Sequence, residues 1–203
     1  ANFVGNYFEL NGYNYNTLNA SGTNNPARTT FGGTLVKDDE KIQVRCVEWF
    51  VHGLHVTSNS VTASEGMAFN RSWMTASITN LQLDAGGELR VRNASSLCKN
   101  QTLNIGNLTG AGDMVFGWAA FDTNSFFRID VDNSDFAGLI KLNRGTLRFG
   151  DTLDLPLTKL EVNNNGENAV QLENNALFGE FSFGGTAVDP GTYTAAELNT
   201  LLS

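Results

Sequence analysis

Short apolar–polar–apolar segments recur along the second half of the chain, and a few Asn, Asp, Gly or Arg residues separate them. The segments form local pairs, namely 81–83 with 89–91, 140–142 with 147–149, and 160–162 with 170–172. In a β-strand, alternate side chains point to opposite faces, so this pattern places Leu, Ile, Val and Phe inward and polar residues outward. The pattern predicts many short strands joined by tight turns.

Weak self-similarity of this kind is typical of a solenoid, in which each unit buries its apolar face against its neighbours. Three-stranded coils of some 20–25 residues would give residues 77–203 about five or six turns, each rising roughly 4.8 Å. We therefore predict an all-β fold, a parallel β-helix or β-solenoid.

The two ends of the chain have different patterns from the repeats. Residues 1–76 lack the regular repeat and are predicted to form an irregular N-terminal cap with some strands, so the coils occupy 77–188. In residues 189–203, Thr194 and Glu197 have the spacing of a helix capping box, and apolar residues follow at helical intervals. We expect a turn and a short helix there, which would cover the last coil as part of a single structural domain.

Composition supports the β-fold and excludes some classes of function. The chain has 21 Gly but only 3 Pro, which suits strands that are paired on both edges. A net charge of −8 argues against a nucleic-acid binder. No run approaches the ~18 apolar residues of a membrane helix, so membrane insertion is not expected.

Cys46 and Cys98 are the only cysteines. A disulfide between them would fit an exported protein, whereas two buried free thiols fit the sequence equally well. The chain also begins Ala-Asn-Phe, as a processed mature chain would.

Residues 103–203, and less closely residues 77–102, resemble the autotransporter-associated β-strand repeat, which is common in large secreted and surface proteins of bacteria. The resemblance rests on a Gly-x-Gly turn and the spacing after it, carried by Gly110, Gly112, Asn133, Phe136, Gly138, Ile140, Leu142, Gly145 and Leu147. It implies a right-handed parallel β-helix and export. The repeat carries no catalytic residue, so the resemblance assigns none here.

Aromatic residues are the main candidates for a binding site. Exposed Trp and Tyr rings on a β-scaffold can stack on sugar rings, while Asn, Gln and Asp bond to the hydroxyls. Trp118 lies between small residues and Tyr13 and Tyr15 are flanked by Asn, so these three are the best candidates. Trp49 and Trp73 add to the set, whereas the Phe residues are expected in the core.

Metal sites are weaker candidates. Asp130 and Asp132 faintly resemble a calcium loop, but the Gly and Glu that such a loop needs are missing. His52 and His55 would face opposite sides of a strand unless the chain bends at Gly53.

The leading hypothesis is an extracellular bacterial module, without catalytic activity, that binds a polysaccharide as part of a larger secreted protein. One alternative is a small β-helix polysaccharide lyase or glycoside hydrolase, with Lys141, Arg144 and Arg148 as candidate basic groups. A second alternative is a structural or adhesive stalk segment. No cofactor is expected apart from the calcium ion considered above.

Overall fold

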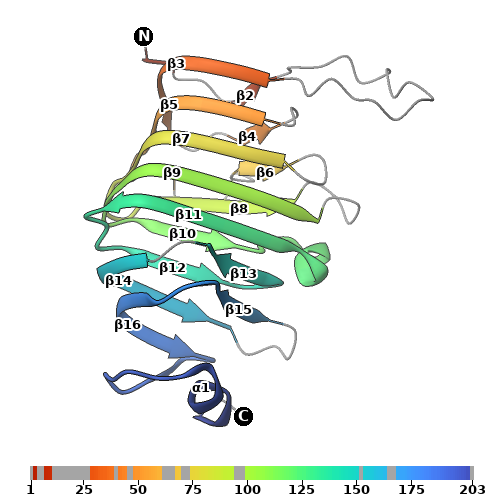
Figure 1. The fold of residues 1–203 in the computed structure, drawn as a ribbon. Helices are drawn as coiled ribbons and strands as arrows, with labels where there is room; N and C mark the ends of the chain where they lie inside the picture. Colours follow the sequence, from red (N-terminus) through yellow and green to blue (C-terminus); the bar gives the residue numbers. More distant parts are fainter. Residues whose placement is uncertain are drawn as a thin grey trace, which may run out of the picture.

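The computed structural model describes residues 2–3, 7–10, 28–38, 41–44, 48–60, 67–69, 74–93, 99–150, 153–163 and 168–201. They form two sheets whose neighbouring strands are parallel, with one antiparallel exception at the C-terminal end. The fold is all-β and is consistent with a β-solenoid, as the sequence predicted (Figure 1).

From β1 to β16, strands that follow one another in sequence belong to opposite sheets. The eight-stranded sheet holds β1 (Asn2–Phe3), β3 (Arg28–Lys37), β5 (Glu48–Val56), β7 (Met74–Leu83), β9 (Asn100–Gly110), β11 (Phe126–Ser134), β13 (Thr146–Phe149) and β15 (Ala169–Leu172). The nine-stranded sheet holds β2 (Tyr7–Leu10), β4 (Lys41–Val44), β6 (Met67–Phe69), β8 (Glu88–Asn93), β10 (Asp113–Phe116), β12 (Leu139–Leu142), β14 (Leu153–Val162), β16 (Ala176–Phe183) and β17 (Thr186–Ala187). Each coil thus gives one strand to each sheet, rather than the three strands expected.

The coils are unequal in length. Asn80 and Asn107 bond to each other across adjacent coils and are 27 positions apart, whereas Lys141 and Glu161 do the same over 20 positions. In the ladders that join β7 to β9, β9 to β11 and β12 to β14, the pairing nevertheless advances by one residue on both strands at a time, with no register shift. Like side chains therefore stack above one another even though the turns between the strands vary.

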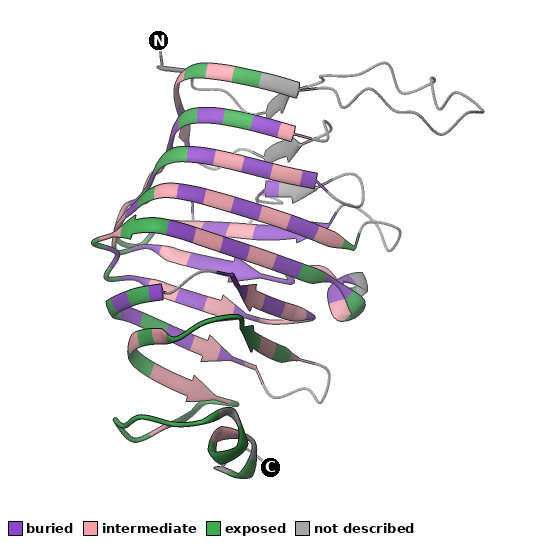
Figure 2. Ribbon diagram, in the orientation of Figure 1, coloured by how far each residue is buried: buried purple, intermediate pink, exposed green. Residues whose placement is uncertain are grey.

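The core is the space between the two sheets. Inward side chains form columns that run along the stack, one of which is Leu89, Met114, Ile140 and Leu160, and another Val91, Phe116, Leu142 and Val162. Figure 2 shows the alternation of buried and less buried positions along the central strands. Burial of these apolar columns stabilises the stack, at roughly 1.5–3 kcal/mol for each fully buried large side chain.

The stack begins earlier than the sequence predicted. β3 and β5 already pair in parallel with each other, and β5 continues in register with β7. Residues before 77 therefore contribute strands to the same two sheets, and the boundary at 76 does not separate an irregular region from the coils.

The predicted C-terminal helix is present as α1 (Ala195–Leu201), at the end of the stack beyond β16 (Figure 1). The Glu197 carboxylate accepts hydrogen bonds from the Thr194 backbone N–H and hydroxyl, and the Glu197 backbone N–H bonds to the Thr194 Oγ1, which completes the capping box. These bonds hold the pKa of Glu197 below its usual value. The cover is partial, because Leu172 and Leu177 in the last coil are 48% and 53% exposed.

Candidate functional site

Trp118 is the large aromatic side chain that the described residues expose most, at 47%. It follows β10 directly, after Gly117, whose φ of 71° turns the chain away from the sheet. The Trp118 ring lies over the guanidinium group of Arg90 on β8, with 3.9 Å between Arg90 Cζ and the ring centroid. A cation placed over an indole face is an attractive contact, so Arg90 fixes the ring against the outer face of the nine-stranded sheet.

A buried polar network anchors the segment that carries Trp118. The fully buried Asp122, in the 3₁₀ helix η1 (Ala120–Asn124), accepts hydrogen bonds from the backbone N–H of Ala119 at 2.9 Å and of Asn93 at 3.1 Å. The Asn93 side-chain amide donates a further bond to the same carboxylate. Burial raises the pKa of Asp122, and these hydrogen bonds oppose that shift. Residue 119 is thereby tied to the end of β8, which positions its neighbour Trp118.

The surface beside Trp118 is a row of side chains in register on the outer face. Arg90, Val115, Lys141 and Glu161 occupy neighbouring strands of the nine-stranded sheet. Val115 points outward, since its neighbours Met114 and Phe116 belong to the core, yet it is only 5% exposed. Long side chains such as Arg and Lys cover apolar surface with their aliphatic stems, and the flanking Arg90 and Lys141 are placed to do so.

Three cations on this outer face are paired with carboxylates, and a fourth, Arg92 on β8, is buried and donates a hydrogen bond to the backbone carbonyl of Asn93. Arg90 Nε bonds to Glu88, Lys141 Nζ lies 2.5 Å from Glu161 Oε1, and Lys159 Nζ lies 2.8 Å from Glu180 Oε2. These pairs join neighbouring strands or neighbouring positions on one strand. Little uncompensated positive charge therefore remains beside Trp118.

Asp113 on β10 is the exception to this pairing. Its carboxylate is half-buried beside Glu88 on β8, and no hydrogen bond or ion pair to it is found within the described residues. Burial raises the pKa of Asp113, the nearby Glu161 raises it further, and Lys141 opposes the shift. A carboxylate left in this state destabilises the folded chain when it is ionised.

We expect Asp113→Asn to stabilise the fold more at pH 7 than near pH 3. Because the folded-state pKa lies above the ordinary value of 3.8, the folded state binds more protons in the interval between the two, and stability falls as pH rises through it. The amide does not ionise and escapes this loss. Denaturant midpoints of both chains at the two pH values test this, and an equal difference at both pH values would contradict it.

Trp49 was predicted to be a sugar-stacking residue, and this prediction is wrong. It lies on β5 with 1% exposure and faces the core, while its neighbour Phe50 faces out at 38%. In the next coil Trp49 pairs in register with Ala76, whose small side chain leaves room for the indole inside the stack. Its ring cannot reach a ligand.

Five other residues singled out in the sequence lie outside the described part of the chain. They are Tyr13, Tyr15 and Trp73 among the candidate aromatics, together with Cys46 and Cys98. The roles of the three aromatic residues stay predictions, as do the two alternatives for the cysteines, a disulfide or two free thiols.

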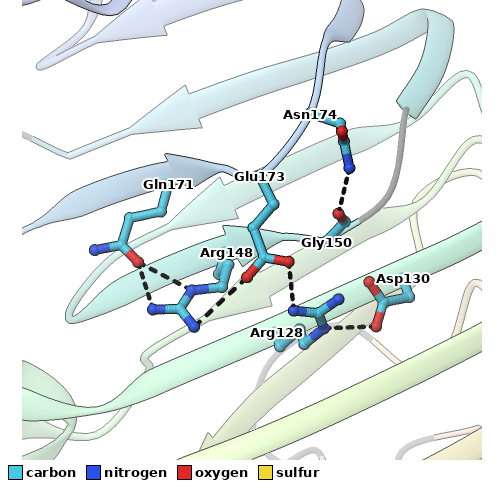
Figure 3. Close-up of polar contacts among 7 residues, drawn as sticks. All are labelled: Arg128, Asp130, Arg148, Gly150, Gln171, Glu173 and Asn174. Carbon is cyan, nitrogen blue, oxygen red and sulfur yellow. Dashed lines mark hydrogen bonds and ion pairs between the residues drawn. The ribbon is translucent and has the colours of Figure 1, made fainter.

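The proposed calcium ligands are placed differently from a cation site. Asp130 on β11 accepts a 2.8 Å hydrogen bond from Arg128, so the guanidinium group already pairs with this carboxylate (Figure 3). Asp132 lies two residues further on and is exposed. The described residues contain no group of three or more His, Cys, Asp or Glu side chains that could hold a metal ion. The calcium hypothesis stays a prediction, because Arg128 engages one oxygen of Asp130 while the buried Asp130 Oδ1 has no hydrogen-bond partner among the described residues.

Arg128 belongs to a cluster on the outer face of the eight-stranded sheet. The Glu173 carboxylate bonds to Arg128 at 2.8 Å and lies 3.6 Å from Arg148, which also donates two hydrogen bonds to Gln171 (Figure 3). The hydrogen bonds of Arg128 to Asp130 and to Glu173 raise the pKa of Arg128, and the bond to Asp130 is the larger cause. The cluster fastens the last coil to two earlier ones and has the character of a structural clip.

His52 and His55 both lie on the solvent side of β5, because alternation breaks at the two buried residues Gly53 and Leu54. This is the bend that the sequence required for the two rings to share a face. His55 Nε2 lies 2.9 Å from Asp84 Oδ2, and this hydrogen bond lowers the pKa of Asp84.

The basic groups considered for a lyase do not converge. Lys141 lies on the outer face of the nine-stranded sheet, where Glu161 engages it, and Arg148 lies on the outer face of the eight-stranded sheet. Since the core separates these faces, the two side chains cannot act in one groove. Arg144 lies in the turn between the two strands.

Comparison with models of known protein families, with curated proteins and with solved structures gives no match to this chain. In the described part of the chain, the single α-helix has seven residues, too few to cross a bilayer. Sequence reasoning found Trp118 but missed Arg90 and Asp113, which adjoin it only through strand register.

Proposed function

We propose that the chain is a non-catalytic carbohydrate-binding module that holds a polysaccharide on the outer face of its nine-stranded sheet. The observation that carries this proposal is the Trp118 ring, which Arg90 fixes from one side and which remains half exposed. Tryptophan is enriched at binding sites, and an exposed indole that is already held in one position loses little conformational freedom when a ligand packs on it, which supports a role in binding.

The chemistry of the surface supports a sugar ligand. The axial C–H groups of a pyranose form an apolar face that packs on an aromatic ring, while its hydroxyls need hydrogen-bond partners at the edge. Trp118 supplies the ring, Arg90 on β8 lies against it, and Asp113 and Lys141 lie on the same outer face of the sheet. Stacked coils repeat roughly every 4.8 Å, so the surface extends along one direction, as a linear chain ligand requires.

We expect Trp118→Ala to lower retention on an insoluble polysaccharide at least about tenfold, as expected for loss of a central aromatic contact. The measurement is a depletion isotherm on a panel of insoluble polysaccharides, with thermal unfolding recorded in parallel. The matched control is Phe50→Ala, which removes a partly exposed aromatic ring from the other sheet and should leave retention unchanged.

Equal retention of the native chain and Trp118→Ala would overturn the site. Failure of the native chain to bind any polysaccharide would overturn the function and favour a structural or adhesive stalk. Release of new reducing ends by the native chain would instead identify a lyase or hydrolase.

The wider setting of the module is also part of the proposal. The resemblance to autotransporter-associated repeats supports a right-handed winding of the coils and a place in a larger secreted or surface protein of bacteria. Right-handed connections between parallel strands of one sheet are the strongly preferred form, which agrees with that winding.

A further inference from the structure

Asp113 stands out within the proposed site because its carboxylate has no hydrogen-bond or ion-pair partner among the residues that the structure describes. Its neighbours on the outer face are all engaged, with Glu88 bonded to Arg90 and Lys141 bonded to Glu161. Asp113 is nonetheless half-buried, and it pairs in register with Glu88 rather than with a cation. A desolvated carboxylate without hydrogen bonds costs stability, so the position is better suited to a ligand than to the fold.

Asp113 and Trp118 are connected through the outer face of the nine-stranded sheet. Both belong to the segment 113–118, and the Trp118 ring folds back over Arg90, which is in register with Val115. Val115 is two residues from Asp113 on the same outer face, a spacing of about 7 Å along a strand. A pyranose stacked on Trp118 therefore brings its edge toward this carboxylate.

The charges of the face restrict the ligand. Arg90, Lys141 and Lys159 on this outer face are each paired with a carboxylate, and Arg92 is buried, so these four cations are not available to neutralise a uronate or a sulfate. The whole chain carries a net charge of −8, which repels polyanions at long range. The unpaired group can only accept hydrogen bonds, and the hydroxyls of an uncharged sugar can donate them.

We propose that Asp113 accepts hydrogen bonds from sugar hydroxyls beside Trp118, and that the ligand is an uncharged polysaccharide rather than an acidic one. This inference rests on the proposed function and names the substrate class of that site. Asp113 is a binding residue that fixes the orientation of the sugar, while Trp118 supplies most of the contact area.

The test compares the native chain, Asp113→Ala, Trp118→Ala and a control, Asp132→Ala, on three kinds of polymer. The control removes an exposed carboxylate from the outer face of the eight-stranded sheet. The polymers are uncharged (cellulose, chitin and xylan), polyanionic (polygalacturonate) and polycationic (chitosan). We expect the native chain and Asp132→Ala to bind an uncharged polymer, and Asp113→Ala to bind it about tenfold more weakly, as loss of a hydrogen bond to a charged group predicts.

The outcomes distinguish the role of Asp113 and the ligand class from the proposed carbohydrate-binding function. Loss of binding in Trp118→Ala with full binding in Asp113→Ala would overturn the role of Asp113 and leave the module's function standing. Stronger native binding to polygalacturonate or to chitosan than to every uncharged polymer would overturn the ligand class alone. No binding by the native chain to any of the polymers would overturn both.

Thermal unfolding of each variant shows whether a loss of binding results from a loss of folding. Asp113→Ala should unfold no earlier than the native chain, because the carboxylate that it removes has no partner within the described residues. Weak binding together with clear destabilisation would contradict the proposal, since it would assign Asp113 a structural role.

Discussion

Gly138→Ala should lower the denaturant midpoint more than any other glycine-to-alanine change at a described position without positive φ. A Cβ atom at Gly138 would lie 1.9 Å from the backbone oxygen of Gly112 in the preceding coil and 2.4 Å from the Phe136 ring. The backbones are tied together here, because Gly112 O accepts from Leu139 N–H and Gly138 O accepts from Lys159 N–H. The coils must therefore separate locally to admit one methyl group, at a cost of about 3–5 kcal/mol.

The measurement is urea unfolding followed by circular dichroism, with Gly32→Ala as the control. A Cβ at Gly32 meets no atom within 4 Å, so the control should change stability by less than about 0.5 kcal/mol. A Gly138→Ala midpoint as close to native as that of the control would mean that the coils do not approach each other at this corner.

Phe127→Ala should cost about 3–5 kcal/mol, the range for deleting a buried aromatic ring. Phe127 on β11 is 1% exposed, and its ring centroid lies 5.8 Å from that of Phe116 on β10. The two rings therefore join the two sheets across the core. The cavity left by alanine cannot be refilled by small shifts, because both strands are held by parallel ladders on each side.

The adjacent residue supplies the control. Phe126 is 41% exposed and points away from the core, so Phe126→Ala removes the same atoms with a much smaller loss of burial. Near-equal destabilisation by the two substitutions, measured in the same urea experiment, would contradict the assignment of inward and outward faces on β11.

The fold was largely predictable from the second half of the sequence because glycine and apolar residues there mark fixed places in a coil. A Cβ at Gly110 would lie 1.9 Å from Leu83 O, and at Gly112 it would lie 2.5 Å from Asp84 O, so both positions require backbone to pass close to backbone. The apolar positions of the same pattern are almost fully buried, namely Phe136, Ile140, Leu142 and Leu147. The pattern therefore indicated both the corners and the inward columns.

The first half was harder to interpret because its strands do not alternate cleanly. In β5 both Gly53 and Leu54 are buried, so a prediction that alternates inward and outward positions assigns the residues after Gly53 to the wrong faces. The partner strand β3 has a matching register shift between Phe31 and Thr34. The number of strands in each coil depends on where the turns bend, which composition does not specify.

The candidate site was predictable only in part. Small neighbours on both sides of Trp118 favoured its exposure, and the structure bears that out. The opposite placement of Trp49 follows from Ala76 one coil away, which no local pattern contains. Arg90 and Asp113 depend on register in the same way, because residues of different coils become neighbours only after the strands are aligned.

Backbone amide NMR can show directly whether a sugar binds on the outer face of the nine-stranded sheet. The ligand is a soluble oligosaccharide, cut from an uncharged polysaccharide that retains the native chain. We expect shifts for amides of residues 88–91 and 113–118, with the Trp118 indole N–H among the largest, and none along the outer face of β7 and β9. Shifts confined to β7 and β9, or absent from residues 113–118 at saturating ligand, would contradict this expectation.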